Sequence, residues 1–370
     1  MGLPNVVRES HKVSTDFAVE GVRFSPIAFF LTATLINLFP ILTLMICLGI
    51  ESTAHTFGVG IITEEGKPLA NVKDSYTSEK EGIHPTKAKE HHIEVADKVI
   101  KDALTEANLT LKDIDLISFS QGPGLPPCLV VGMEKAKELS KKHNLPLVGV
   151  NHCIAHLSIG ELTTGCKDPV LLYVSGANTQ IIAYEGKKYR IFGETLDMGI
   201  GNFIDSFARL IGIGFPGGPK IQELAEKTTN YIELPYSVKG MDISVGGIFT
   251  NLKNKVDSNN YSNEELSYSL QETVFAMLTE VAERAMAHCQ KNELLLGGGV
   301  ACNTRLQEMT KIMCKDRKAE CFIPSNGVLT DNALMIAWQG ILEKDKASKH
   351  IEQIDIKPHW RTDQVNVNWK

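Results

Sequence analysis

Two histidines four positions apart carry the clearest chemical signal in this sequence. His152 and His156 follow an apolar run, Pro146–Val150, that is typical of a strand. If a helix opens at Asn151, the two imidazoles lie on one face, where they can share a metal ion. The chain has 11 histidines among 370 residues, so this spacing alone is close to chance. Two surface histidines on a helix remain the alternative interpretation.

A metal site needs a third ligand, and Asp331 offers a hard carboxylate late in the chain. It stands at the start of a predicted helix, Thr330–Leu342, where it could equally serve as a helix cap. Two imidazoles and one carboxylate with open positions suit iron(II) or zinc. The zinc-protease motif HExxH requires a glutamate after the first histidine, and here that residue is Cys153.

Several turns in the sequence are candidates for holding a nucleotide. Small polar turns at Ser52-Thr53 and Ser175-Gly176 follow strands, and their N–H groups can face phosphate oxygens, although ordinary turns look the same. Three glycines, Gly297–Gly299, separate a buried strand from a predicted helix, Arg305–Met313, which favours ligand binding there. In this turn Asn303 can contact a ribose or a base. No GxxxxGK[ST] phosphate loop is present in the sequence.

A further loop, Phe215–Lys220, precedes the predicted helix Ile221–Lys227. Upstream of it, Asp205 lies in the predicted helix Asn202–Leu210. Its carboxylate can hold ribose hydroxyls, or it can be a solvated helix residue, and the sequence does not separate these interpretations.

The elements that must position these residues alternate between strands and helices, which predicts an α/β unit. The predicted strands are Ile46–Ile50, Gly58–Ile62, Asn71–Tyr76, Asp115–Ser120 and Pro146–Val150, and the helices are Pro85–Asn108, Gly132–His143 and one opening at Asn151. The first helix has apolar residues at helical spacing: Ile93, Ala96, Val99, Ala103 and Leu104. A second unit follows with strands at Val170–Val174 and Gln180–Tyr184, and its opening echoes Cys47–Thr53. This echo predicts a duplicated unit facing a shared cleft.

The composition limits the domain organisation and the functions that this chain can have. A chain of 370 residues that is 43% hydrophobic is expected to form two domains. Its net charge of −6 gives no general basic field, so nucleic-acid binding would need a local patch or a partner. The eight cysteines form no CxxC pair, which favours reduced thiols and a cytoplasmic protein.

Residues 1–44 form a hydrophobic extension. No charged residue occurs from Ser25 to Ile50, yet Met45 directly precedes the first predicted strand. We favour Met45 as the true start of the protein. Two alternatives remain. Residues 26–44, if they are translated, could form a membrane anchor, or the extension could be a disordered or cleaved leader.

Taken in order, these residues resemble the family of universal tRNA threonylcarbamoyladenosine synthases. The family comprises bacterial TsaD and the catalytic subunit of the KEOPS complex, and was formerly labelled O-sialoglycoprotein endopeptidase. The resemblance covers about residues 46–345 and is of the archaeal type. The matching stretches are Leu48–Thr56, Gly82–Pro85, Glu90–His92, Gln121–Leu125, Asn151–His156, Tyr173–Gln180, Phe215–Pro219, Lys239–Asp242, Gly297–Asn303 and Thr330–Asn332.

The resemblance implies an actin-like ATPase (ASKHA) fold, with two duplicated RNase H-like domains around a nucleotide cleft. We expect domain I at residues 45–166, domain II at 167–345 with its final helix packing back on domain I, and a tail at 346–370. The implied metal ligands are His152, His156 and Asp331, and no catalytic residue is implied. The implied substrate-binding residues are Tyr173, Val174, Ser175, Gly176, Ala177, Asp205, Gly218, Gln222 and Asn303.

The implied reaction transfers a threonylcarbamoyl group from threonylcarbamoyl-AMP to N6 of the adenosine 3′ of the anticodon, in tRNAs that read codons beginning with A. The implied cofactor is one divalent metal per subunit, iron(II) or zinc, with ATP or threonylcarbamoyl-AMP in the cleft. The implied partners are tRNA and the other KEOPS subunits: a small atypical protein kinase, a dimerising subunit and a subunit that binds the tRNA tail. The chain ends at Lys370, so we expect the kinase to be a separate chain.

Four positions depart from the family pattern. Gln222 replaces Glu, Ala177 replaces Gly, Gly246 replaces Ser and Ala333 replaces Gly. Gln222 can still hydrogen-bond a ribose, so we expect altered affinity rather than inactivity, whereas Ala177 would crowd a turn of positive φ. The rival functions are a metalloprotease, a non-enzymatic actin-like scaffold and a small-molecule kinase. In a small-molecule kinase the two metal-binding histidines would have no role.

Overall fold

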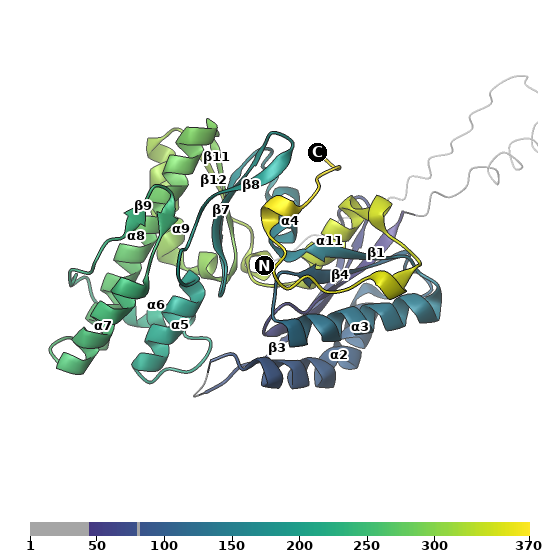
Figure 1. Ribbon diagram of the computed structural model, residues 1–370, viewed down its shortest axis with the longest axis horizontal. Coiled ribbons are helices and arrows are strands. Elements are labelled where there is room, and N and C mark those ends of the chain that lie inside the picture. The colour runs from purple at the N-terminus through teal and green to yellow at the C-terminus, as the bar shows by residue number, and fades with distance from the viewer. Residues whose placement is uncertain (1–43, 80–81) are drawn as a thin grey trace, which may run out of the picture. The chain divides into compact units, whose positions relative to one another are not determined.

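A computed structural model describes residues 44–79 and 82–370 (Figure 1). The predicted extension at residues 1–44, with its alternatives as a misplaced start, an anchor or a leader, lies outside the described residues except for Leu44. Within the described ranges, no helix is both long and apolar enough to cross a membrane. All eight cysteines are free thiols.

The first sheet has the strand order β3-β2-β1-β4-β5. Its strands are β1 (Ile46–Glu51), β2 (Thr56–Thr63), β3 (Pro68–Ser75), β4 (Leu116–Gly122) and β5 (Leu147–Asn151). β1 pairs antiparallel with β2 and parallel with β4, and β4 pairs parallel with β5. Figure 1 shows α2 (Pro85–Ala107) and α3 (Pro126–His143) on one side of this sheet and α11 (Ala333–Leu342) on the other.

The second sheet repeats this arrangement. Its order, read from the opposite edge, is β8-β7-β6-β11-β12, with strands β6 (Val170–Val174), β7 (Thr179–Glu185), β8 (Lys188–Glu194), β11 (Glu293–Gly297) and β12 (Glu320–Phe322). The first strand again pairs antiparallel with the second and parallel with the fourth, and the fourth again pairs parallel with the fifth. The predicted duplication is therefore confirmed by the matching order and direction of the strands.

The remaining elements connect and cover these sheets. The helices are α4 (His152–Thr164), α5 (Ile200–Leu210), α6 (Gly218–Ala225), α7 (Gly246–Ser258), α8 (Asn263–Cys289), α9 (Thr304–Asp316) and α10 (Asn326–Leu329). A small ribbon of β9 (Val238–Lys239) and β10 (Asp242–Ile243) and four 3-10 turns, η1 (Gly299–Cys302), η2 (Lys344–Lys346), η3 (Ile351–Gln353) and η4 (Thr362–Gln364), complete the described chain.

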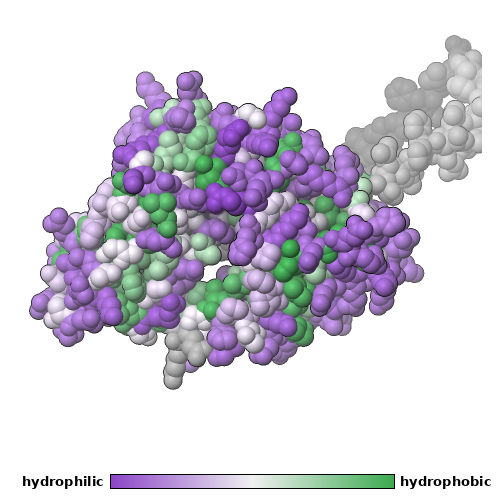
Figure 2. All heavy atoms as spheres, viewed as in Figure 1, coloured by the Kyte–Doolittle hydropathy of each residue, from purple (hydrophilic) through white to green (hydrophobic). Residues whose placement is uncertain are grey.

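Each sheet has its own hydrophobic core. Leu172, Phe203 and Leu270 belong to the cluster between the second sheet and its helices, whereas Leu48 and Val99 belong to the cluster between the first sheet and α2. On the face shown in Figure 2, hydrophobic residues form small separate groups among hydrophilic ones. Most large apolar side chains are therefore buried in these cores, as hydrophobic burial requires.

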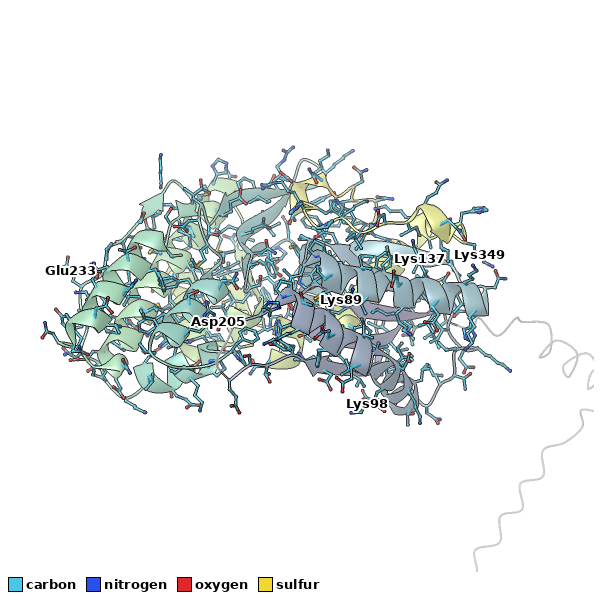
Figure 3. All side chains as sticks on the ribbon, turned by 60° about the horizontal axis from the view of Figure 1, so that its bottom comes forward. Lys89, Lys98, Lys137, Asp205, Glu233 and Lys349 are labelled. Atoms are coloured by element: carbon cyan, nitrogen blue, oxygen red, sulfur yellow. The ribbon has the colours of Figure 1, made fainter. Side chains whose placement is uncertain are left out.

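Helix α2 shows how its sequence pattern sets one buried face. Ala96, Val99 and Ala103 are buried against the sheet, while Lys89 and Lys98 project from the helix (Figure 3). Ile93, which shares the helical spacing of these residues, is instead 58% exposed. It lies next to the buried His92, which occupies the position facing β2 instead.

Two predicted helices begin elsewhere. α3 begins at Pro126, six residues before the predicted Gly132, because two prolines suit the first turn, where N–H groups have no helical partner. The final helix begins at Ala333 and not at Thr330, because the side chain of Asn332 accepts a hydrogen bond from the Met335 N–H at 3.1 Å and caps it.

Candidate metal and nucleotide site

The site begins where β5 ends and α4 starts. The side-chain oxygen of Asn151 accepts hydrogen bonds from the N–H groups of Cys153 at 3.0 Å and Ile154 at 3.2 Å. This cap fixes the helix start at His152, as the sequence predicts. His152 and His156 therefore lie on one face, with their ring centroids 4.8 Å apart.

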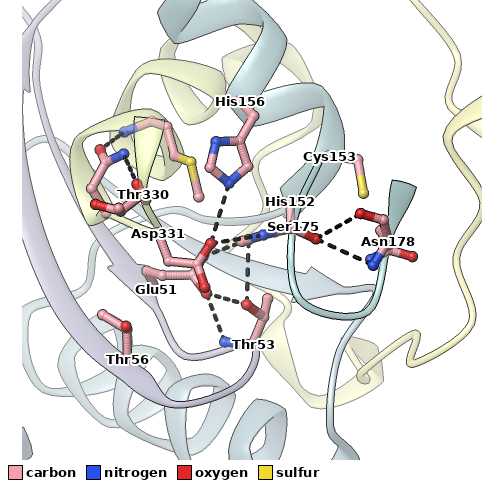
Figure 4. A network of polar contacts seen from close by, with 12 residues as sticks. Glu51, Thr53, Thr56, His152, Cys153, His156, Ser175, Asn178, Thr330 and Asp331 are labelled. Carbon is pink, nitrogen blue, oxygen red and sulfur yellow. Dashed lines mark hydrogen bonds and ion pairs between the residues drawn. The ribbon is translucent and has the colours of Figure 1, made fainter. Parts of the chain in front are cut away.

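Asp331 joins the two histidines from a distant part of the chain (Figure 4). Its Oδ1 lies 3.4 Å from Nε2 of His152 and 3.3 Å from Nε2 of His156. One ligand atom from each of the three residues lies within 4.8 Å of the others. The alternative interpretation of Asp331 as the cap of the final helix is wrong. Asn332 takes that role and leaves the Asp331 carboxylate facing the histidines.

Burial and charge set the protonation of this group. Burial lowers the pKa of His152, but the carboxylates of Glu51 and Asp331 outweigh it and raise that pKa well above the usual value. For His156 burial prevails and the pKa is lowered. Burial raises the pKa of Asp331, yet hydrogen bonds from both imidazoles hold it well below its usual value. The ionised carboxylate of Asp331 and the neutral imidazole of His156 can therefore bind a cation, whereas His152 must release a proton to do so.

The donor chemistry fits a divalent metal. Two imidazole nitrogens and one carboxylate oxygen are ligands that iron(II) and zinc accept. Tyr173 lies beside them, with its ring centroid 5.0 Å from that of His156. The Tyr173 hydroxyl is buried and has no hydrogen-bond partner. A buried polar group without a partner is costly, which is consistent with a ligand at this position.

Tyr173 to Ala177 span the carboxyl end of β6 and the following turn. The N-terminus of α5 holds this turn, because the N–H of Gly201 donates to Ser175 O at 3.0 Å and that of Asn202 to Gly176 O at 2.9 Å. The expected crowding at Ala177 is wrong, since Ala177 is not among the residues of positive φ. The turn therefore accommodates an alanine without backbone strain.

The glycine turn Gly297–Gly299 packs directly on this segment. Gly298 has a φ of 89°, and a Cβ there would lie 2.3 Å from Val174 O. Only glycine allows both this backbone conformation and this approach. Two of the predicted nucleotide turns are thus brought together. By contrast, a Cβ at Gly299 would meet no atom within 4 Å, so packing does not explain that glycine.

The remaining predicted substrate-binding residues form two groups. Asp205 on α5 accepts a hydrogen bond from the Gly217 N–H at 2.8 Å, which places it beside Gly218 at the start of α6. Burial raises the pKa of the Asp205 carboxyl. In the second group, Nε2 of Gln222 donates to Thr304 Oγ1 at 3.0 Å. The neighbouring Asn303 caps α9 through its side-chain oxygen, a structural role that the sequence did not indicate.

A pocket of about 370 Å³ adjoins the second group. It is lined by Gln222, Glu226, Gln271, Thr304, Arg305 and Glu308. Of the predicted substrate-binding residues, only Gln222 is part of its lining.

Two residues of the site were missed in the sequence. Glu51 ends β1 with no exposed surface, and one of its carboxylate oxygens lies 3.0 Å from Nδ1 of His152. Lys73 on β3 donates to the backbone oxygen of Asp331 at 2.9 Å. A charged residue closing an apolar strand is a usable signal for Glu51, because buried carboxylates need partners.

The repeated sheets define the class of the protein, an actin-like ATPase fold. HypF of T. kodakarensis superposes with a TM-score of 0.60 at 15% identity, over 82% of this chain and 48% of that chain. Component A of the (R)-2-hydroxyglutaryl-CoA dehydratase of Acidaminococcus fermentans gives 0.52 at 12% identity, over 81% and 99%. At these identities the likeness shows the fold alone.

Sequence comparison identifies the family. Residues 67–338 match TsaD, tRNA N6-adenosine threonylcarbamoyltransferase. Relatives with that name from Thermococcus sibiricus and Thermococcus kodakarensis are 53% and 54% identical over 326 residues, which cover 88% of this chain and all of theirs. A probable bifunctional tRNA threonylcarbamoyladenosine biosynthesis protein of Methanocaldococcus jannaschii is 49% identical, and the match spans 60% of it. The chain belongs to the tRNA N6-adenosine threonylcarbamoyltransferase family and is a transferase of tRNA threonylcarbamoyladenosine synthesis.

Proposed function

We propose that this chain transfers the threonylcarbamoyl group from threonylcarbamoyl-AMP to N6 of the adenosine 3′ of the anticodon, in tRNAs that read codons beginning with A. It acts as the metal-dependent catalytic subunit of a KEOPS-type complex in the cytoplasm. The observation that carries the metal-dependent part is the convergence of His152, His156 and Asp331 beside Tyr173. A divalent ion held there supplies charge stabilisation to phosphate or carbonyl oxygens.

The chain's own residues bind and orient the adenylate. We assign the turn Tyr173–Ala177 to the phosphate, and Asp205, Gly218, Gln222 and Asn303 to the adenosine side. Backbone N–H groups and fixed side chains lower the barrier by holding the reacting atoms close and in line. This assignment is supported by the packing of Gly298 on Val174, through which the turn Gly297–Gly299 contacts the turn Tyr173–Ala177.

The reaction needs no protein nucleophile. N6 of the adenosine forms a bond to the carbamoyl carbon, the bond from that carbon to the phosphate oxygen breaks, and AMP leaves with the electron pair while N6 loses a proton to water. AMP is a good leaving group and requires little acid assistance. Cys153, the thiol nearest the histidines in sequence, is 1% exposed, and burial raises its pKa, which disfavours the reactive thiolate.

We expect partner subunits to supply the positive charge for tRNA binding that this chain lacks. A net charge of −6 favours tRNA binding through a complex and not through this subunit alone. The relative from Methanocaldococcus jannaschii is named bifunctional and extends beyond the matched region. We propose that a small atypical protein kinase and the other KEOPS-type subunits complete the assembly.

One reconstitution tests the assignment. The protein and its partners are incubated with tRNA, threonine, bicarbonate, ATP and the enzyme that forms the adenylate. We expect threonylcarbamoyladenosine in the digested tRNA, and its formation should fail after the metal is removed and return when iron(II) or zinc is added. If a relative such as the Thermococcus kodakarensis protein forms the product in the same mixture and this chain does not, the proposed function is wrong.

A further inference from the structure

Glu51 is a fully buried carboxylate whose two oxygens contact different partners. Oε1 accepts hydrogen bonds from the Thr53 N–H at 2.7 Å and from the Thr53 hydroxyl. Oε2 lies 3.0 Å from Nδ1 of His152. Figure 4 shows the side chains of Glu51, Thr53 and Asp331 gathered around the His152 imidazole. Burying an ionised carboxylate is costly unless such partners satisfy it.

This arrangement fixes which nitrogen of His152 keeps its proton when the ring is a neutral metal ligand. The two Thr53 donors occupy Oε1, so Oε2 is the acceptor for Nδ1–H of the ring. A neutral imidazole has a single N–H, and placing it on Nδ1 leaves the lone pair on Nε2. Nε2 is the nitrogen that faces Asp331, at 3.4 Å from Oδ1. The ring is therefore held in the tautomer and orientation that a metal ligand needs.

We propose that Glu51 is a positioning residue that holds His152 as a metal ligand through Nδ1–H. The inference rests on the proposed metal site. Glu51 is not itself one of the three residues whose ligand atoms converge. Its effect on catalysis is indirect, through the affinity and geometry of the metal.

Glu51→Gln is the sharpest test because it replaces one carboxylate oxygen by an NH2 group with almost no change in volume. The donors of Thr53 keep the new amide oxygen on their side, so the amide NH2 faces Nδ1 of His152. Nδ1 must then accept, and the single proton moves to Nε2, where it blocks metal binding. We expect the affinity for Zn²⁺ or Co²⁺, measured by titration of the metal-free protein, to fall about 10- to 100-fold.

Two controls separate positioning from general damage. Glu343→Gln makes the same change in another carboxylate that is 2% exposed, beyond the far end of α11 from Asp331. It should leave metal affinity unchanged. Thermal unfolding of the metal-free Glu51→Gln protein should stay close to that of the parent. His152→Ala shows whether the site binds metal at all.

The outcomes distinguish the inference from the proposed function. Loss of affinity in Glu51→Gln and His152→Ala but not in Glu343→Gln supports the positioning role. Parent-like affinity in Glu51→Gln, with loss in His152→Ala, overturns it. If His152→Ala also binds normally, the proposed metal site is wrong. Should Glu51→Gln not fold, ¹⁵N NMR of His152 in the zinc-loaded parent decides, because a proton on Nε2 contradicts the proposal.

Discussion

Each element of the candidate metal group is held by a further polar residue. Asn151 caps the helix that carries both histidines, and Glu51 contacts His152. Lys73 donates to Thr330 Oγ1 at 2.7 Å and to the backbone oxygen of Asp331 at 2.9 Å. Ligands that are fixed before the metal arrives lose less entropy on binding and hold a better geometry. The candidate group is therefore pre-organised for a metal.

Replacing a candidate ligand should remove both metal and activity. In His156→Ala, one of three ligands is lost, and we expect bound metal to disappear from the purified protein. Transfer activity should fall by about 1,000-fold or more, because a metal supplies several kcal/mol of stabilisation and about 1.4 kcal/mol is a factor of ten. Metal content is measured by mass spectrometry, and activity by threonylcarbamoyladenosine formation.

Cys153→Ala provides the matched control for that experiment. Cys153 lies in the same helical turn but packs in the cluster of Ile154 and Leu157. This variant should keep its metal. Loss of metal from both variants to the same extent would show that His156→Ala acts by destabilising α4 and not by removing a ligand.

Gln222→Glu tests the departure of this chain from its family. The Gln222 amide is oriented by Thr304 and lines the pocket of about 370 Å³. A carboxylate there accepts charge-assisted hydrogen bonds from ribose hydroxyls, which are stronger than those of an amide. We expect ATP to bind roughly three- to tenfold more tightly, measured by calorimetry. Unchanged affinity in both Gln222→Glu and Gln222→Ala would place the ribose elsewhere.

At the scale of elements, helix α11 positions Asp331 by its close approach to the first sheet. A Cβ at Gly60 of β2 would lie 2.3 Å from Leu334 N, and one at Gly49 of β1 would lie 2.3 Å from Ala337 N. Two glycines on adjacent strands thus let the helix backbone rest directly on the sheet. Asp331 lies two residues before this helix, so the height of α11 above the sheet sets the position of the carboxylate.

Gly60→Ala should therefore harm both stability and the metal site. The added methyl forces α11 away from β2, which should lower the free energy of unfolding by about 1–3 kcal/mol or more. Metal affinity should fall as well, because Asp331 moves with the helix. Gly58→Ala on the same strand is the control, since its Cβ would meet atoms no closer than 3.4 Å. Equal losses in both variants, measured by urea unfolding, would rule out close packing as the cause.

The sequence predicts elements well where a local cause sets them. The cap at Asn151 and the apolar run before it gave the start of α4 and the shared face of its histidines. The long helix α8 was missed although Ser262 and Glu265 form a capping box at its start, which is a readable signal. Ile93 is exposed although it shares the spacing of the buried residues, because helical spacing does not say which of several neighbouring stripes meets the sheet.

The site is less predictable because its contacts join distant segments. Asp331 is 175 residues from His156, and Lys73 is 258 residues from Asp331. No spacing rule connects such positions, so the sequence offered Asp331 only as a candidate ligand, and the resemblance to a family implied its role. The contact of Lys73 appears only when α11 packs over the first sheet. Glu51 could have been predicted from the sequence, because a carboxylate that ends a buried strand needs a partner.

At the scale of the whole described chain, the last residues link the two sheets. The Lys357 N–H donates to Gln121 O at the end of β4, at 2.7 Å. Asn151, the cap of α4, donates to Trp360 O at 3.2 Å. Farther on, the Thr362 hydroxyl donates to Gln180 Oε1 on β7, at 3.1 Å. The tail therefore contacts the first sheet, the helix that carries the histidines and the second sheet in succession.

The hydrophobic residues of the tail complete a core behind the candidate metal group. Val365 is 1% exposed and belongs to the cluster that contains Cys153, Ile154 and Tyr173. Val367 packs against the same cluster but is only half-buried. The tail thus packs against residues of α4, which links the end of the chain to the helix that carries the histidines.

Val365→Ala should loosen α4 more than the matched Val367→Ala. Removing two buried methyl groups should cost about 2 kcal/mol of unfolding free energy at Val365, and less at the half-buried Val367. If the tail supports α4 locally, amide hydrogen exchange at residues 153–157 should accelerate in Val365→Ala while the strands of the first sheet keep their protection. Metal affinity should fall in the same order as this protection. A loss of stability spread evenly over both sheets, with α4 exchange changed no more than the rest, would contradict a specific role of the tail behind the site.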